Sequence, residues 1–273
     1  MFEIDSPEID REKTYENGKI FTLTRDVTGD DAINVDDLEW SYLDGDGDFR
    51  SDEITALRDA ADIVITNPPF SLFREFLAWL VEGGKRFSII GNMNAITYKE
   101  VFPLIKDNKM WLGSGFHAGN AYFSSPTSRD YAAGVYDGDT GLVKFRNVVW
   151  MTSIEHGRRH QPLSLMTKAD NIKFSKHKEV RGVGYQKYDN YDAIEVPFTD
   201  AIPSDYDGVM GVPISFLDKY NPDQFEILGS QRWAKSLIVS EIYRGKKTAE
   251  TDFKTTIDGR ETYDRIFIRH KKD

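Results

Sequence analysis

Residues 62–80 read DIVITNPPFSLFREFLAWL, and they carry the clearest indication of the fold in this sequence. The apolar run Ile63–Ile65 predicts a short buried strand. Pro68 and Pro69 follow shortly after it, although proline has no N–H to donate to a sheet and forces the residue before it out of the helical region. Two prolines at the end of a strand therefore indicate a requirement other than secondary structure.

The residues that follow the prolines predict a strand–helix–strand unit. An apolar stripe at helical spacing predicts a helix with Ser71 as its N-cap and Gly83-Gly84 as its stop, and its members are Phe73, Phe76, Leu77 and Leu80. The run RFSIIGN, residues 86–92, predicts the next strand. This order predicts an α/β fold in which helices cover a parallel sheet. Residues 67–70 then lie at the carboxyl end of a strand, where open α/β sheets bind ligands.

The composition divides the chain into three regions. Its 273 residues, 40% hydrophobic and 13% aromatic, allow one large core or two modest ones. Residues 1–41 are polar and predict a poorly packed lead-in. Residues 42–146, with a helix expected at 51–61, form the core that carries Asn-Pro-Pro-Phe. Residues 147–273 are aromatic and loop-rich, and we expect a second, less regular region there rather than a continuation of the sheet.

The residue counts exclude several classes of function. The chain has no cysteine, which excludes disulfides, thiolate chemistry and cysteine-ligated zinc. The net charge of −10 argues against a general polyanion binder, although basic residues gather in the second half. No apolar run reaches the roughly 18 residues of a membrane span, and the start of the chain has no signal-peptide pattern. We therefore expect a cytoplasmic location and no membrane partner.

The tetrapeptide Asn67–Phe70 suits chemistry on a planar exocyclic amine. The lone pair of such a nitrogen is conjugated into its ring, so a catalyst must accept hydrogen bonds from the N–H groups to free it. The side-chain oxygen of Asn67 and the carbonyl of Pro68 supply two acceptors, and the prolines stiffen the loop that holds them. Phe70 offers a flat face on which a purine can stack once it has left its helix. The alternative is a plain strand-to-helix turn that the prolines end.

Ordered motifs between residues 44 and 230 resemble the adenine-specific methyltransferase EcoRI family. They include DGDFRSDEI, DIVITNPPFSLFREF, SIIGNMNAITYKEVF, HGRRHQPL and FEILG. The resemblance implies a Rossmann-like fold, S-adenosylmethionine as cofactor, and transfer of a methyl group to N6 of adenine in double-stranded DNA, within restriction–modification. It also implies that Asn67 and Pro68 accept from the amine, with Asn67 beside the cofactor. Pro69 would shape the loop, and Phe70 would stack on the flipped base.

The resemblance also implies a cofactor contact at Asp48-Phe49. In related methyltransferases an acidic–aromatic pair upstream of the tetrapeptide holds the adenine of the cofactor, and Asp48 and Phe49 occupy that place. The alternative for Asp48 is an acid at a helix start. The cofactor-binding strand and loop that the family places further upstream are not recognisable here. The sequence therefore predicts an incomplete sheet with an exposed apolar edge, and either a separate polypeptide that supplies the missing strand or a chain that binds cofactor weakly.

Two basic segments predict contacts to the DNA backbone. Arg158, Arg159 and His160 form one short segment, and arginine side chains match phosphate oxygens. The second segment is a lysine-rich stretch with interleaved aromatic residues, and its predicted contact residues are Lys176, Lys178 and Arg181. The alternative for both is an ordinary solvated surface.

Two further features have an ordinary interpretation. The segment DVTGDDAINVDD, residues 26–37, has oxygen-bearing residues at positions 1, 3, 5, 9 and 12 of a calcium-binding loop. Its sixth position is Asp31 instead of glycine and its twelfth is Asp37 instead of glutamate, so we favour an acidic, turn-rich loop over a calcium site. In the catalytic site we expect no metal, because the sulfonium of the implied cofactor is already the electrophile. His117 has no partner at metal-ligand spacing, and the glycines around it indicate a tight loop.

Two other functions compete with DNA methylation. The same tetrapeptide occurs in methyltransferases of protein glutamine side chains and of RNA amino groups, where the nitrogen is again planar. A non-catalytic DNA-binding remnant that lacks the cofactor half is the third hypothesis, and it predicts DNA binding without affinity for S-adenosylmethionine.

Overall fold

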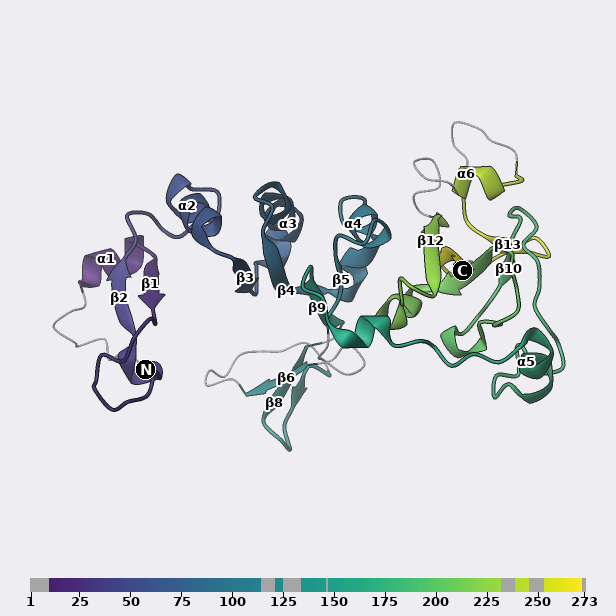
Figure 1. Cartoon of the computed structure of the whole chain (residues 1–273), viewed down its shortest axis with the longest axis horizontal. Helices are drawn as coiled ribbons and strands as arrows, with labels where there is room; N and C mark the ends of the chain where they lie inside the picture. The colour runs from purple at the N-terminus through teal and green to yellow at the C-terminus, as the bar shows by residue number, and fades with distance from the viewer. Residues whose placement is uncertain are drawn as a thin grey trace. The chain divides into compact units, whose positions relative to one another are not determined.

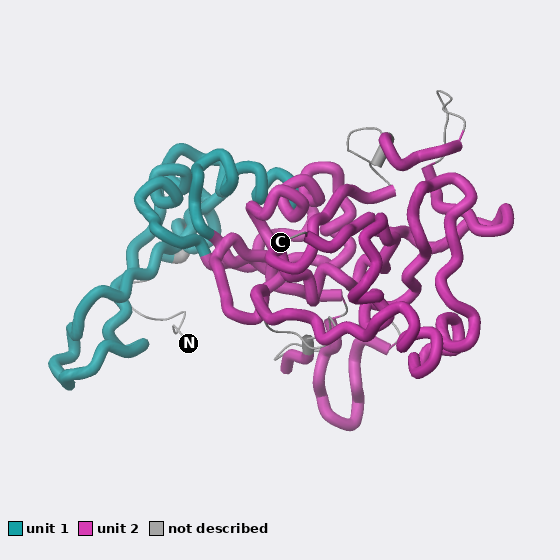
Figure 2. Tube along the Cα trace, turned by 45° about the vertical axis from the view of Figure 1, so that its right-hand side comes forward, with its two compact units in different colours: residues 1–64, 72–86 teal, residues 65–71, 87–273 magenta. Residues whose placement is uncertain are grey.

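The computed structural model describes residues 10–113, 121–124, 134–145, 147–231, 239–245 and 253–271. The chain forms two compact units (Figure 2). The first comprises Met1–Val64 and Leu72–Arg86, and the second comprises Ile65–Ser71 and Phe87–Asp273. The unit boundaries cross the Asn-Pro-Pro-Phe region twice, so the tetrapeptide belongs to the second unit and the helix after it belongs to the first.

The first unit begins with regular structure in the region that the sequence predicts to be a poorly packed lead-in. Helix α1 (Arg11–Glu16) precedes an antiparallel pair of strands, β1 (Lys19–Thr22) and β2 (Glu39–Tyr42). A 3-10 turn, η1 (Val35–Asp37), lies just before β2. Asn17 donates from its side chain to the carbonyls of Leu43 and Asp44 at 2.9 Å, and this contact ties the end of α1 to the segment after β2.

Helices α2 (Asp52–Ala60) and α3 (Phe73–Glu82) complete the first unit and confirm the predicted positions. Helix α3 buries the four apolar residues of the predicted stripe and ends at Gly83, after which Gly84 has a φ of +63°. The predicted N-cap is wrong. Leu72 occupies that position without a side-chain hydrogen bond, because Ser71 lies within the 3-10 turn η2 (Phe70–Leu72) that precedes the helix.

The central sheet has the order β3-β4-β9-β5 (Figure 1). Its strands are β3 (Ile63–Thr66), β4 (Arg86–Asn92), β5 (Trp111–Leu112) and β9 (Val148–Thr152). Strands β3 and β4 confirm the predicted strands on either side of the helix. Strand β9 pairs antiparallel with both β4 and β5, so the expectation of a parallel sheet is wrong for these three strands.

Strand β9 also corrects the expectation that the sheet stops before residue 147. Val148, Val149, Met151 and Thr152 are all buried, and the run pairs with β4 from Asn92 to Ser88. A short apolar strand between two others is buried on both faces, which explains why its sequence lacks the alternation of an exposed strand. The 3-10 turn η3 (Met93–Thr97) and helix α4 (Phe102–Lys106) connect β4 to β5.

Between β5 and β9 the chain forms a small antiparallel sheet of order β6-β8-β7. Its strands are β6 (Ala121–Ser124), β7 (Tyr136–Asp137) and β8 (Leu142–Phe145), and Figure 1 shows β6 and β8 side by side. Residues 114–120, which contain His117, lie outside the described residues.

The rest of the second unit has a sheet of its own, with the order β10-β11-β15-β12. Its strands are β10 (Ile194–Glu195), β11 (Met210–Pro213), β12 (Phe225–Ser230) and β15 (Arg265–His270). Short elements surround this sheet. They are the turns η5 (Gly157–His160), η6 (Thr199–Ala201) and η7 (Ile214–Lys219), the helices α5 (Lys168–Phe174) and α6 (Val239–Ile242), and the hairpin of β13 (Thr256–Ile257) and β14 (Arg260–Glu261). Phe216, Phe225 and Phe267 are fully buried and form part of its core.

The fold is therefore mixed α/β with several sheets. Within the described ranges, no helix is long and apolar enough to cross a membrane.

Candidate active site

The Asn-Pro-Pro-Phe loop lines a cavity at the end of β3. The cavity has a volume of about 560 Å³, within the size range of small-molecule sites. The loop contributes Asn67, Pro68, Pro69 and Phe70, and the other lining residues are Ile90, Phe123, Phe145 and Val148. All eight belong to the second unit. The predicted catalytic residues are thus brought together on one cavity.

The local sequence leaves the side chain of Asn67 available. Pro68 is buried, whereas Asn67 and Phe70 are exposed, and Phe70 has 48% of its surface accessible. In the part of the chain that the structure describes, the side chain of Asn67 makes no hydrogen bond, so its amide oxygen is free to accept from a ligand. Because neither proline can donate to a neighbouring strand, the chain leaves the sheet here and turns the loop toward the cavity.

Sequence reasoning missed the remaining walls of the cavity. Ile90 lies on β4 and Val148 on β9, while Phe123 and Phe145 lie on β6 and β8. The rings of Phe123 and Phe145 meet edge to face, with centroids 5.4 Å apart and planes at 82°. The runs AYFS and LVKF are short and rich in aromatic and apolar residues, which is compatible with strands, but nothing in them shows which residues those strands face.

Of the predicted cofactor residues, Asn67 lies in the second unit, whereas Asp48 and Phe49 lie in the first and fit S-adenosylmethionine only in part. Asp48 accepts from Arg50 at 2.9 Å (Nε) and 2.6 Å (an η nitrogen), and these hydrogen bonds lower the pKa of its carboxyl to about 2. An ionised carboxylate has more acceptor positions than Arg50 uses, so a contact to an amino group remains open. Phe49 does not suit the predicted stacking, because its ring is buried against Phe76 and Trp79 with centroids 5.1 and 5.6 Å away.

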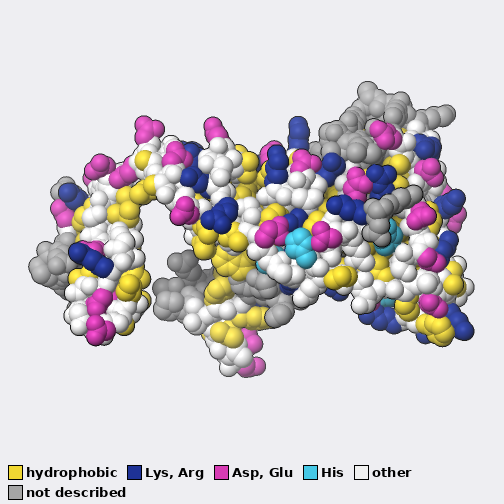
Figure 3. Space-filling model, viewed as in Figure 1, with side chains coloured by type: hydrophobic (Ala, Val, Ile, Leu, Met, Phe, Trp, Pro, Cys, Tyr) yellow, Lys and Arg dark blue, Asp and Glu magenta, His cyan; other side chains and the backbone are white. Residues whose placement is uncertain are grey.

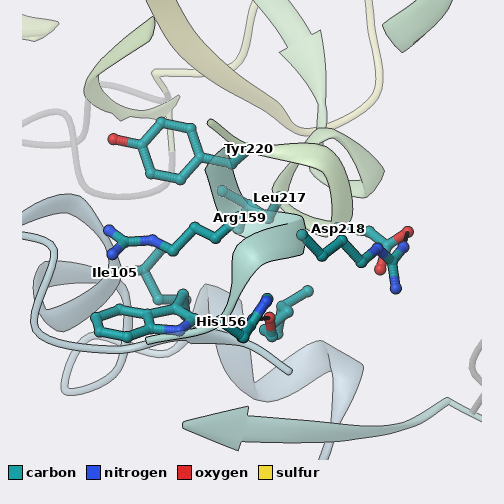
Figure 4. Close-up of a pocket in the computed structure, with 9 residues that line it drawn as sticks. Ile105, His156, Arg159, Leu217, Asp218 and Tyr220 are labelled. Carbon is teal, nitrogen blue, oxygen red and sulfur yellow. Dashed lines mark hydrogen bonds and ion pairs between the residues drawn. The ribbon is translucent and has the colours of Figure 1, made fainter. Parts of the chain in front are cut away.

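The first basic segment contains one arginine that the structure places in the interior. Arg159 extends into a small pocket lined also by Ile105, Leu217 and Tyr220 (Figure 4). Only 6% of its side chain is exposed, and its guanidinium lies 3.8 Å from the ring centroid of Trp111. This position corrects the expectation of a phosphate contact, because a buried guanidinium cannot reach the DNA backbone.

Hydrogen bonds explain why Arg159 is held inside. One η nitrogen donates to Asn108 at 2.5 Å, and the other donates to the carboxylate of Glu155. The ring of Trp111 adds a cation–π contact, so the charge is compensated from two sides. Arg159 therefore joins the segment around β5 to the turn η5 and has a structural role.

Acidic side chains also pair with the two neighbours of Arg159. Arg158 contacts Asp218 at 3.1 Å, and His160 contacts Asp223 at 2.6 Å and Glu155 at 2.8 Å. The hydrogen bond to Asp223, followed by the one to Glu155, raises the pKa of His160. The segment therefore carries little net positive charge, although Arg158 and His160 are accessible.

The second basic segment is more exposed and less neutralised. Lys176 contacts Asp200 at 2.6 Å, whereas Lys178 and Arg181 are exposed and make no ion pair within the described parts of the chain. Phe174 is 60% exposed beside them, and Figure 3 shows basic and apolar side chains gathered over α5. We define this α5 patch as Lys173, Phe174, Lys176, Lys178 and Arg181.

The acidic loop before β2 gathers three carboxylates. One oxygen each of Asp26, Asp30 and Asp37 lies within 4.8 Å of the others. Asp37 is buried and accepts from the backbone N–H of Asn34 and Thr28, and these bonds lower its pKa to about 2. The carboxylates thus organise the turns of this loop, and their spacing is also compatible with a bound cation.

The mixed α/β fold and the Asn-Pro-Pro-Phe loop beside an apolar cavity are together typical of amino-group methyltransferases. Residues 3–271 match the family described as "Adenine-specific methyltransferase EcoRI", and the chain belongs to this family.

Three curated relatives are similar to the chain. It is 42% identical over 240 residues to the type II methyltransferase M.EcoRI of Escherichia coli, and this match covers 87% of the present chain and 66% of M.EcoRI. It is 37% identical over 195 residues to M.MgeORF184P of Mycoplasma genitalium, covering 68% and 57%, and 36% identical over 205 residues to M.MpnI of Mycoplasma pneumoniae, covering 72% and 60%. The chain thus spans less than two thirds of the length of these relatives. No solved structure matches it.

Proposed function

We propose that this chain transfers a methyl group from S-adenosylmethionine to N6 of adenine in double-stranded DNA, as a type II modification enzyme or part of one. The observation that carries this proposal is the cavity beside Asn67–Phe70, in which an amide oxygen without a hydrogen-bond partner adjoins apolar walls. Membership of the adenine-specific family supports adenine in DNA over glutamine side chains or RNA amino groups.

In this proposal each residue of the loop has a task. The side-chain oxygen of Asn67 and the carbonyl of Pro68 accept from the two N–H groups of the adenine amine, which frees the nitrogen lone pair for attack. Pro69 fixes the direction of the loop, and Phe70 stacks on the flipped base. The cofactor supplies the methyl group on a positively charged sulfur, and no metal is needed for that transfer.

Three finer features belong to the same proposal. The central sheet is part of a Rossmann-like methyltransferase sheet. Further strands, which another segment or a separate polypeptide provides, pair with β3 on the side away from β4. The exposure of Ile65, 67% on the outermost strand of the order, supports this, because apolar residues on a sheet edge are normally covered. Residues 147–273 contact DNA, with the α5 patch on its backbone, and the enzyme acts in the cytoplasm where its substrate lies.

The test is methyl transfer from radiolabelled S-adenosylmethionine to plasmid DNA, together with calorimetric titration of the cofactor. We expect Asn67→Ala to lower kcat by about 100-fold or more, in the range found when one preorganised hydrogen-bonding group is removed from an active site. Asn94→Ala is the matched control, since Asn94 is exposed and does not line the cavity.

Each outcome separates the competing functions. Transfer to DNA that Asn67→Ala abolishes and Asn94→Ala preserves supports the proposal. Transfer to RNA or to protein, with none to DNA, would replace it with the second hypothesis. DNA binding without measurable cofactor affinity would show that this chain does not methylate DNA by itself, as a non-catalytic remnant or a part that needs a further polypeptide would behave.

A further inference from the structure

We propose that the antiparallel strands β6 and β8 form an aromatic wall of the target-base pocket, in which Phe123 and Phe145 hold the flipped adenine against the Asn-Pro-Pro-Phe loop. This inference rests on the proposed function and deepens it. It assigns a substrate-positioning role to two residues that lie far from the tetrapeptide in sequence.

The register between β6 and β8 directs the rings of Phe123 and Phe145 to one face of the small sheet. Ala121 pairs with Phe145, and Phe123 pairs with Val143. Cross-strand partners lie on the same face of a sheet, and side chains alternate along each strand. Phe123 and Phe145 therefore share a face as diagonal neighbours, and both line the cavity beside Asn67–Phe70. Tyr122 pairs with Lys144 and belongs to the opposite face.

The exposed fraction of the side chains differs along this face, between the buried Val143 and the accessible Phe123 and Phe145. Val143, on the same face, is 2% exposed. Phe123 and Phe145 are each 46% exposed, close to the 48% of Phe70. Three half-exposed phenylalanines around one cavity leave apolar surface in water, and a flat ligand in the cavity would cover it.

The chemistry of the walls selects the kind of ligand. Of the cavity-lining residues in the described chain, Asn67 alone has a polar side chain. A ligand that fits must therefore present broad apolar faces and place its polar edge at Asn67. A purine with an exocyclic amine meets both conditions. The edge-to-face pair of Phe123 and Phe145 suits a base, because a base that stacks on one ring meets the other at an angle.

The experiment compares Phe123→Leu and Phe145→Leu with Tyr122→Leu. Leucine keeps an apolar side chain but removes the flat ring. Tyr122 is the matched control, since it lies on the same strand, is 57% exposed and does not line the cavity. Two quantities are measured: kcat/KM for plasmid DNA with radiolabelled cofactor, and the quenching of 2-aminopurine deoxyribonucleoside fluorescence by the protein. The calorimetric Kd for S-adenosylmethionine and the circular dichroism spectrum test whether each variant remains intact.

We expect each phenylalanine variant to lower kcat/KM by roughly 5- to 150-fold, the range for loss of one base–aromatic stack, and to weaken nucleoside quenching. The change should appear mainly in KM for DNA, with the cofactor Kd unchanged. Phe123→Tyr should restore both readouts because it restores the ring. Tyr122→Leu should stay within about 2-fold, since it removes no such stack.

Failure of this inference differs from failure of the proposed function. Normal kcat/KM and normal quenching in both leucine variants would overturn the aromatic wall and leave the methyltransferase proposal standing. A wild-type chain that methylates no DNA, yet loses nucleoside quenching on Phe123→Leu or Phe145→Leu, would overturn the proposed function and support the wall. If one variant does not fold, the other decides, because each ring contributes a separate side of the cavity.

Discussion

Removal of the carboxylate of Glu195 should destabilise the second unit strongly. Glu195 on β10 and Arg265 on β15 form an ion pair across 70 residues of sequence, with the Nε of Arg265 at 3.0 Å from both carboxylate oxygens. Tyr188 donates its hydroxyl to the same carboxylate. Burial, followed by the negative charge of Glu195, raises the pKa of Tyr188 well above its ordinary value, so the phenol keeps the proton that it donates.

The magnitude follows from the burial of the pair. Only 8% of the Arg265 side chain and 11% of the Glu195 side chain are exposed. In Glu195→Ala the guanidinium stays buried without a counter-charge, and loss of one partner from a buried pair costs about 3–5 kcal/mol of unfolding free energy. For a unit of this size, that cost corresponds to a fall in Tm of roughly 6–20 °C.

The double variant Glu195→Met/Arg265→Met separates the pair from its burial. With both charges replaced by apolar side chains of similar length, no charge remains to be compensated, so stability should return to within about 1–2 kcal/mol of wild type or exceed it. Urea unfolding followed by circular dichroism measures all three proteins. A cost of less than about 1 kcal/mol for Glu195→Ala, or a double variant as unstable as the single one, would show that the buried ion pair does not govern the stability of this unit.

Three other predictions concern charge. His160 has a raised pKa, so its ion pairs contribute stability fully below its unfolded pKa of 6.5 and lose it as the pH rises through the folded value; Asp223→Asn should lower the pKa seen by ring-proton NMR. Asp37 has a pKa of about 2 against 3.8 when unfolded, so its contribution is complete above pH 4 and is lost between about pH 4 and pH 2; amide exchange in residues 26–37 should accelerate in that window and stay unchanged if the loop is held otherwise. Lys178→Ala and Arg181→Ala should each reduce the slope of log affinity for DNA against log salt by about 1, and an unchanged slope would remove the α5 patch from the DNA surface.

Local patterns in the sequence were sufficient for the elements around the tetrapeptide. The apolar runs at β3 and β4 and the stripe of α3 predicted those elements to within a residue or two, because each depends on neighbours along the chain. The positions of Pro68 and Pro69 at a strand end likewise follow from what proline cannot do. The family, too, is legible from the order of short motifs.

Contacts between distant segments decided the rest. Val148–Thr152 reads as an ordinary apolar run, and only pairing places it between β4 and β5. Arg159 belongs to a basic segment that predicts a phosphate contact, yet contacts with Trp111, Asn108 and Glu155 hold its guanidinium in the protein interior. Phe49 has the position of a cofactor contact but packs on α3 instead.

The aromatic wall of the candidate active site shows the same division. Asn67 and Phe70 can be recognised in the sequence because they belong to a rare tetrapeptide, whereas Phe123 and Phe145 belong to short strands that resemble many others. The place of these two rings depends on the register of β6 with β8 and on the position of both strands beside the Asn-Pro-Pro-Phe loop. Side-chain periodicity shows which residues share a face, but only tertiary contacts determine what that face meets.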